Sequence, residues 1–201
     1  FETVSGLTTT GASIFSSPED LPRGILLWRA LTQWMGGMGI LVLMLALLPK
    51  LSEGSVNLMK AESPGPISSK LRPKTGETAR ILYRIYIILT AAEALLLRLA
   101  GMPWFDAVTT ALTTISTGGF SVRNASISYY GSSAVNWILI FFMFISSINF
   151  SLLFMLVTRR AREALKSEEL RAYTLIVLSA TALIAASLFL HTERDLYHSV
   201  E

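Results

Sequence analysis

A short threonine- and glycine-rich segment occurs twice in the chain, each time in the same setting. The first copy reads TTTGA at residues 8–12, and the second reads STGGF at residues 116–120. Each copy follows an amphipathic run that is too short to cross a bilayer. Each is followed, after a polar loop, by an apolar run of about 20 residues, which is long enough. We therefore expect a repeated unit in which a half-length helix, an extended segment and a membrane-spanning helix follow one another.

The apolar stretches of the chain predict four membrane-spanning helices of about 20 residues each. These stretches are residues 24–48, 79–99, 135–157 and 172–190. The third contains no charge, whereas the second carries Arg84, Glu93 and Arg98 and so needs protein neighbours or interfacial positions for them. Only 15% of all residues are charged, against about 25% in soluble domains. We predict an all-α membrane protein.

The basic residues predict the orientation of these helices. Twelve of the 17 lysines and arginines lie in or beside two polar connections, residues 51–78 and 159–171. The positive-inside rule places such connections in the cytoplasm. The two connections that carry the threonine–glycine segments, residues 1–23 and 101–131, then face outward. Because the positive charges cluster between apolar runs, they indicate topology and not a nucleic-acid partner.

The two threonine–glycine segments are our candidates for a cation filter. An alkali ion that sheds its water needs oxygen dipoles in return, and an extended backbone can supply carbonyls for this purpose. Glycine permits the backbone angles required, and threonine adds a hydroxyl. A single such segment could equally be a surface turn, but two copies in equivalent positions favour a filter. The candidate ion-binding residues are Thr9, Thr10, Gly11, Ala12, Ser116, Thr117, Gly118 and Gly119.

Three acidic residues have alternative interpretations. Glu93, inside an apolar stretch, could relay protons or attract cations. It could also pair with Arg98, although a separation of five residues suits an intrahelical pair poorly; we favour such a structural pair. Glu2 and Asp106 begin the two half-length helices, where a carboxylate stabilises the helix dipole. The glycines of residues 33–39 are expected to allow close packing that supports the filter.

The sequence does not predict an enzyme. It contains no nucleophile elbow, phosphate-binding loop or dinucleotide fingerprint, and without cysteine it has no thiolate metal site. His191 and His198 lie near Glu193 and Asp195, but we favour an extracellular end over a metal site there. An intramembrane enzyme that uses Glu93 or these histidines is a rival of another class, and a purely structural subunit is a third. No organic cofactor is expected.

Four segments together resemble the Trk/Ktr/HKT superfamily of potassium transport proteins. These segments are SGLTTTGA, QWMGGMGI, AESPGPISSKLRPKTGETAR and AGMPWFDAVTTALTTISTGGFS. The third is most similar to TrkH-type membrane subunits. The resemblance implies a potassium-channel-like pore of four units with one filter glycine each, here Gly11 and Gly118, so that two of four filter loops are present. It also implies a homodimer, a cytosolic nucleotide-binding regulatory subunit and a multi-pass position in the cell inner membrane.

These observations give an expected organisation and function. The chain starts without Met and inside a unit, so we expect part of a longer protein. The expected parts are a first pore loop and inner span (1–50), a cytoplasmic linker (51–78), a span–pore loop–span unit (79–158), a basic cytoplasmic linker (159–171) and the first span of a third unit with the start of an outer loop (172–201). We expect potassium uptake through backbone carbonyls, with membrane lipid around the protein. A proton- or sodium-coupled carrier that uses Glu93 is the alternative.

Overall fold

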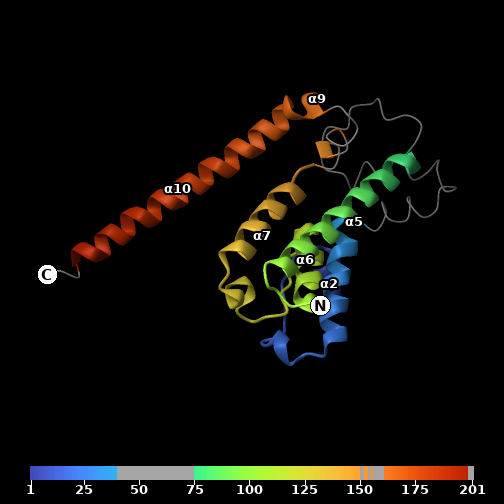
Figure 1. Ribbon diagram of the computed structural model, residues 1–201, viewed down its shortest axis with the longest axis horizontal. Coiled ribbons are helices and arrows are strands. Elements are labelled where there is room, and N and C mark those ends of the chain that lie inside the picture. Colours follow the sequence, from blue (N-terminus) through green and yellow to red (C-terminus); the bar gives the residue numbers. More distant parts are fainter. Residues whose placement is uncertain (40–74, 150–151, 154, 156–160, 199–201) are drawn as a thin grey trace. The chain divides into compact units, whose positions relative to one another are not determined.

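The computed structural model describes residues 1–39, 75–149, 152, 153, 155 and 161–198 (Figure 1). Within these residues the regular structure is helical, and no strand is present. The chain divides into two compact units, residues 1–150 and 151–201. The expected all-α fold is therefore confirmed for the described residues, while most of the predicted linker 51–78 lies outside them.

The first unit contains five α-helices and two 3-10 helices among its described residues. In chain order they are α1 (Glu2–Leu7), η1 (Pro18–Asp20), α2 (Arg23–Gly37), α5 (Thr75–Leu99), α6 (Trp104–Ile115), η2 (Ser126–Tyr130) and α7 (Ser133–Ser146). Pro22 and Pro103 immediately precede α2 and α6, where the fixed φ of proline favours a helix start. The hydroxyl oxygen of Ser132 caps α7 by accepting a hydrogen bond from the Val135 N–H.

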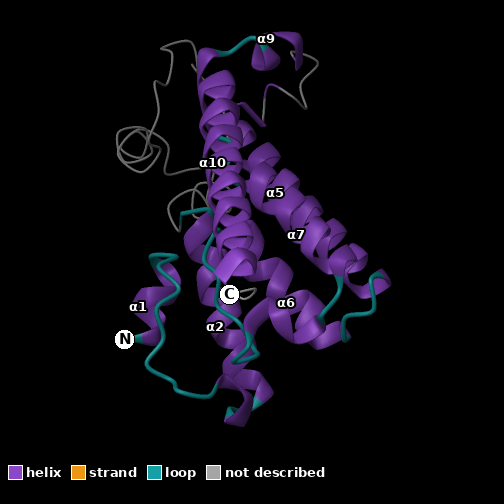
Figure 2. Cartoon of the chain, turned by 90° about the vertical axis from the view of Figure 1, so that its left-hand side faces the viewer, coloured by secondary structure: helices purple, strands orange, loops and turns teal. Residues whose placement is uncertain are grey.

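Helix α6 is the centre of this unit. It contacts α2, α5 and α7, while α1 packs on α2 and α5 packs on α7 (Figure 2). At 12 residues, α6 is about 18 Å long, close to half the hydrocarbon thickness of a bilayer. Two buried clusters hold it in place. They are Leu97, Met102, Ala107, Val135 and Leu139, and Met38, Tyr86, Ile115 and Phe142.

Two of the four predicted spans match long helices. The stretch 79–99 lies within α5, which has 25 residues. The stretch 172–190 lies within α10 (Glu168–His198) of the second unit. Among the described residues, one helical segment, Glu168–Phe189, is both long and apolar enough to cross a membrane.

The other two predicted spans differ from the structure or extend beyond it. Helix α2 ends at Gly37, and residues 40–48 of the first predicted span lie outside the described residues. The third stretch, 135–157, is not one unbroken helix, because α7 ends at Ser146. At this end the Ile148 N–H donates to the Ile145 carbonyl, three residues back instead of four, and such a tightened last turn is common where helices end.

The second unit contains a short helix ahead of its long one. Helix α9 (Ala161–Leu165) is followed by a turn and then by α10. The hydroxyl oxygen of Ser167 accepts a hydrogen bond from the Leu170 N–H and so caps the start of α10. The described part of the basic segment 159–171 therefore belongs to two helices.

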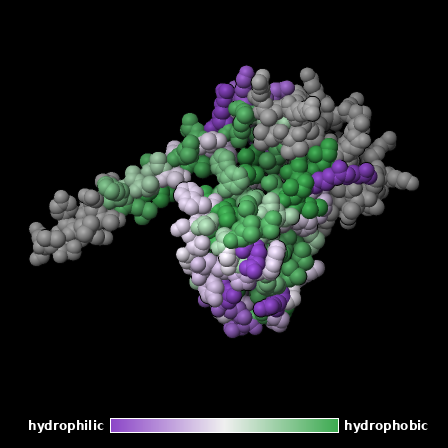
Figure 3. All heavy atoms as spheres, in the orientation of Figure 1, coloured by the Kyte–Doolittle hydropathy of each residue, from purple (hydrophilic) through white to green (hydrophobic). Residues whose placement is uncertain are grey.

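The surface of the first unit has an apolar part and a polar part. On the face drawn in Figure 3, hydrophobic residues gather over the helices, and hydrophilic residues gather at the end that carries the polar loops. The exposed apolar side chains on α7 are Trp137, Ile140, Phe141 and Met143. An apolar surface of this kind indicates contact with lipid or with further protein.

Candidate functional site

The two threonine–glycine loops have the same backbone hydrogen-bond pattern. In each loop, three successive N–H groups donate hydrogen bonds to two carbonyls of the preceding helix. The bonds are Thr9 to Gly6, Thr10 to Ser5 and Gly11 to Ser5 in the first loop, and Thr117 to Thr114, Gly118 to Thr113 and Gly119 to Thr113 in the second. The half-length helices α1 and α6 therefore end in matching turns.

The backbone angles give the same correspondence. Thr9 and Thr117 have positive φ angles of 53° and 55°, and Gly11 and Gly119 have 73° and 81°. Gly11 thus corresponds to Gly119, and the expected pairing of Gly11 with Gly118 is wrong by one residue. That pairing took the first glycine after threonine in each copy, whereas the turn is defined by its hydrogen bonds to the helix. The counterpart of Gly118 is Thr10.

The two loops meet at their glycines. A Cβ atom added to Gly11 would collide with the carbonyl oxygen of Gly118 and would lie 3.5 Å from Nε2 of Gln33. A Cβ atom added to Gly118 would lie 2.6 Å from both Nε2 and Oε1 of Gln33. The structure therefore brings the predicted residues of both loops together, and Gln33 of α2 lies beside the contact.

Glycines on α2 allow this helix to approach both loops. A Cβ atom at Gly36 would lie 2.9 Å from the Cα atom of Leu7, at the end of α1. A Cβ atom at Gly37 would lie 2.6 Å from the Cα atom of Ser116, at the end of α6. The predicted close packing at the glycines of residues 33–39 is thus confirmed for these two positions.

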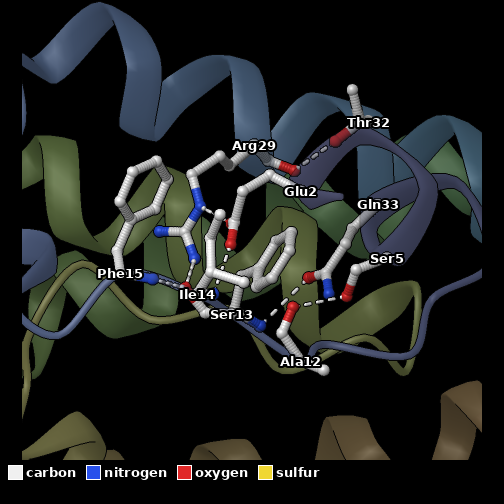
Figure 4. A network of polar contacts seen from close by, with 10 residues as sticks. Glu2, Ser5, Ala12, Ser13, Ile14, Phe15, Arg29, Thr32 and Gln33 are labelled. Carbon is white, nitrogen blue, oxygen red and sulfur yellow. Dashed lines mark hydrogen bonds and ion pairs between the residues drawn. The ribbon is translucent and has the colours of Figure 1, made fainter.

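An ion pair fastens the first loop to α2 (Figure 4). Nε of Arg29 donates to Oε2 of Glu2 at 2.6 Å, and Oε1 of Glu2 accepts a bond of 2.8 Å from the Ile14 N–H. The Arg29 guanidinium also donates to the Ser13 hydroxyl at 3.0 Å and lies 4.2 Å from the centre of the Phe120 ring. Burial raises the pKa of Glu2, but the bonds from Ile14 and Arg29 outweigh it, so that the pKa is lowered overall.

The second loop has a related acidic anchor at the start of α6. Oδ2 of Asp106 accepts hydrogen bonds from Nε of Arg123 at 3.2 Å and from the Tyr130 hydroxyl at 2.7 Å. Burial and the neighbouring Asp106 raise the pKa of Tyr130. Both acidic residues occupy the first turn of a half-length helix, as expected. In addition, each binds the chain that leaves its loop.

Glu93 differs from its predicted role. Its side chain is fully buried, and neither carboxylate oxygen has a hydrogen-bond partner among the described residues. The expected pair with Arg98 is absent from the described contacts, because Arg98 donates to the Met102 carbonyl and lies over the Trp104 ring. Residues five apart lie on different faces of a helix, which explains the difference.

A cavity of about 310 Å³ lies beside the second loop. Its walls include Thr113, Thr117, Gly118, Gly119 and Met143. Within the described residues, a Cβ atom added to Gly119 would meet nothing within 4 Å. The second loop therefore contacts the first loop and Gln33 on one side and faces open space on another.

No group of three or more histidine, aspartate or glutamate side chains that could hold a metal ion occurs among the residues whose positions are described. The side chains of His191 and His198 lie outside the described ones. Arg29 was not among the predicted site residues, and Gln33 was predicted only as part of a segment that packs against the filter. The sequence does contain a signal for them. Arg29, Thr32 and Gln33 are polar residues spaced by three and four positions inside an apolar run, a spacing that places them on one face of a helix.

Fold and site together define a helical protein with a repeated unit, in which a half-length helix ends in a hydroxyl- and glycine-rich turn. The chain belongs to the TrkH family of cation transport proteins, whose family model matches residues 1–191.

Individual relatives agree with this assignment. The chain is 42% identical over 197 residues to the Trk system potassium uptake protein TrkH of Salmonella typhimurium, covering 97% of this chain and 41% of that protein. It is 48% identical over 162 residues to the Escherichia coli protein of the same name, covering 80% of this chain and 34% of that protein. The chain thus spans about two fifths of the curated relatives' length or less.

A solved structure also matches. The crystal structure of the potassium transporter TrkH from Vibrio parahaemolyticus superimposes with a TM-score of 0.69 at 39% sequence identity, covering 87% of this chain and 35% of that chain. The names of the relatives describe potassium uptake and do not favour the coupled-carrier alternative.

Proposed function

We propose that this chain supplies two of the four filter loops of a potassium uptake pore. The observation that carries the proposal is the meeting of the two loops at Gly11 and Gly118. A ring of carbonyls needs loops that approach one another backbone to backbone, and an added side chain at Gly11 would prevent this approach. Membership of a cation transport family supports the same function.

The backbone of the loops suits ion coordination. Positive φ angles occur at Thr9 and Gly11 but not at Thr10 between them, and the same alternation occurs at Thr117 and Gly119. In an ordinary strand successive carbonyls point to opposite sides. Alternating φ signs turn successive carbonyls towards one side, where they can replace the water of an alkali ion. The filter residues are then Thr9, Thr10, Gly11, Ala12, Ser116, Thr117, Gly118 and Gly119.

The remaining loops of the pore would come from chain outside this sequence. The cavity beside Gly118 and Gly119 offers the second loop a place for a neighbour of the same kind. On this basis residues 1–50 and 79–158 belong to the first and second pore units, and residues 172–201 begin the third. Residues 51–78 and 159–171 are cytoplasmic linkers whose basic charge suits contact with a regulatory subunit.

Membership of the family and the apolar surface support the proposed setting. The protein is a multi-pass component of the cell inner membrane, forms a homodimer, and works with a cytosolic nucleotide-binding subunit. An inside-negative membrane potential favours entry of potassium by about 2.3 kcal/mol per charge for each 100 mV. No covalent chemistry is required, and potassium is the cargo.

Rubidium uptake by the full-length protein tests the proposal. Cells that lack their own potassium uptake would express wild type, Gly118→Ser or Gly24→Ser. Gly24 is the matched control, because a Cβ atom there would meet nothing within 4 Å. We expect Gly24→Ser to retain uptake, and Gly118→Ser, whose Cβ would collide with Gln33, to lose rubidium over sodium discrimination. Unchanged discrimination in Gly118→Ser, or no rubidium uptake by wild type, would contradict the proposal.

A further inference from the structure

Gln33 is a buried polar side chain that lies beside the contact between the two loops. It is fully buried on α2, at a level where that helix passes the ends of both α1 and α6. Its Oε1 accepts a hydrogen bond of 3.0 Å from the Phe120 N–H, which follows the second loop. This bond joins residues that are 87 positions apart, so it ties the first repeat to the second.

The other end of the Gln33 amide points towards the first loop. Its Nε2 lies 3.5 Å from the position that a Cβ of Gly11 would occupy, and Figure 4 shows the side chain running from α2 towards the loop that carries Ala12. Nε2 is buried and has no hydrogen-bond partner among the described residues. The hydrogen bond from the Phe120 N–H defines the orientation of the amide, because Oε1 can accept a hydrogen bond and the amide nitrogen cannot.

The sequence of the second loop agrees with this packing. Gly118 has no positive φ angle, so its backbone conformation does not require glycine. Instead, Gln33 occupies the space that a side chain at Gly118 would need. The equivalent position in the first loop is Thr10, which is exposed. The difference between threonine and glycine at equivalent positions therefore follows from the presence of Gln33 beside the second loop.

We infer that Gln33 is a positioning residue that sets the spacing of the two loops and thereby the discrimination between potassium and sodium. It does so by holding the Phe120 N–H with its carbonyl oxygen, a bond that joins the first repeat to the second. Gln33 does not coordinate the ion. The inference rests on the proposed filter function and names a residue outside the loops that determines their geometry.

A pair of substitutions separates positioning from simple filling of space. In full-length protein, Gln33→Met keeps the length of the side chain but removes both polar ends, whereas Gln33→Glu keeps an acceptor for the Phe120 N–H. Trp34→Phe is the matched control, because Trp34 is the next residue on α2 and donates its hydrogen bond to Thr90 on α5, away from both loops. Rubidium and sodium uptake would be measured per amount of purified protein, as both KM and maximal rate.

The expected result is a fall of about tenfold in rubidium over sodium discrimination for Gln33→Met, mainly through KM, with Gln33→Glu keeping most of it. Trp34→Phe should discriminate as wild type does. A space-filling role predicts that Gln33→Met discriminates as wild type does, because methionine has nearly the length of glutamine, and this result would overturn the inference. If Gln33→Met does not accumulate, loss of discrimination in Gln33→Glu overturns it equally. Absence of rubidium uptake by wild type would instead overturn the proposed function and the inference with it.

Discussion

The carbonyl oxygen of Gly118 occupies the place where a side chain on Gly11 would begin. The two residues belong to loops that follow different helices, α1 and α6, and yet their backbones touch. Gly11 also has a positive φ angle, so two independent constraints exclude a side chain there. At its contact with the second loop, the first loop therefore has space for its backbone but not for a side chain.

Substitution of Gly11 by alanine should therefore damage transport more than fold. Gly101→Ala is the matched control, because Gly101 also has a positive φ angle but has open space around its Cβ position and lies outside both loops. Each change should cost about 1 kcal/mol of backbone strain. Only Gly11→Ala should also lower rubidium uptake per protein, by about tenfold or more. Equal rubidium uptake by the two variants would contradict a role for the contact between Gly11 and Gly118 in transport.

The hydrogen bond between Tyr86 and α2 should contribute measurably to stability. The Tyr86 hydroxyl donates to the Trp34 carbonyl at 2.9 Å, and the Tyr86 side chain is buried. Tyr86→Phe removes this donor and should lower the free energy of unfolding by about 0.5–1.5 kcal/mol. Thermal unfolding in detergent would measure the change, with Tyr83→Phe as the control in the same helix. A wild-type midpoint for Tyr86→Phe would contradict the expected contribution.

The Glu2–Arg29 pair predicts a defined pH dependence. The folded-state pKa of Glu2 is below its ordinary value of 4.5, so its stabilising contribution is present above pH 4.5 and is lost as pH falls through the lower folded value. Wild type should therefore unfold at a higher temperature than Glu2→Gln at pH 7. The difference between them should shrink below pH 4.5. A difference that stays constant down to pH 3 would exclude Glu2 as the titrating group.

Substitution of Glu93 distinguishes a passive pore from a coupled carrier. A buried carboxylate without a hydrogen-bond partner among the described residues is costly to keep charged, and a neutral amide of the same shape costs less. We therefore expect Glu93→Gln to retain rubidium uptake and to be at least as stable as wild type. Uptake that disappears while the protein stays folded would instead support proton or sodium coupling through this residue.

Much of the fold follows from the sequence, for physical reasons that are local. The length and apolar composition of residues 79–99 and 172–190 predict long helices, and both are present. The end of α7 at Ser146 was missed, because hydropathy does not register the change in backbone hydrogen bonding at Ile148.

The site was predictable in part. Threonine and glycine composition identified both loops, since glycine suits the positive φ angles of Gly11 and Gly119, and threonine supplies hydroxyl groups. The register between the loops was missed, because it is set by which N–H groups of each turn bond to the preceding helix, and composition does not show this. The hydrogen bond between Gln33 and Phe120 was missed, because it joins residues 87 positions apart. Arg98 was assigned the wrong partner, because residues five apart lie on different faces of a helix; its side chain contacts Met102 and Trp104 instead.

The most direct test of the account is the position of bound ions in the full-length protein. A crystal soaked in rubidium should show anomalous density on one axis bounded by the backbone oxygens of residues 9–12 and 116–119. Under the same conditions Gly118→Ser crystals should show weakened density there. Strong rubidium density elsewhere in the protein, with none between these two loops, would contradict the account.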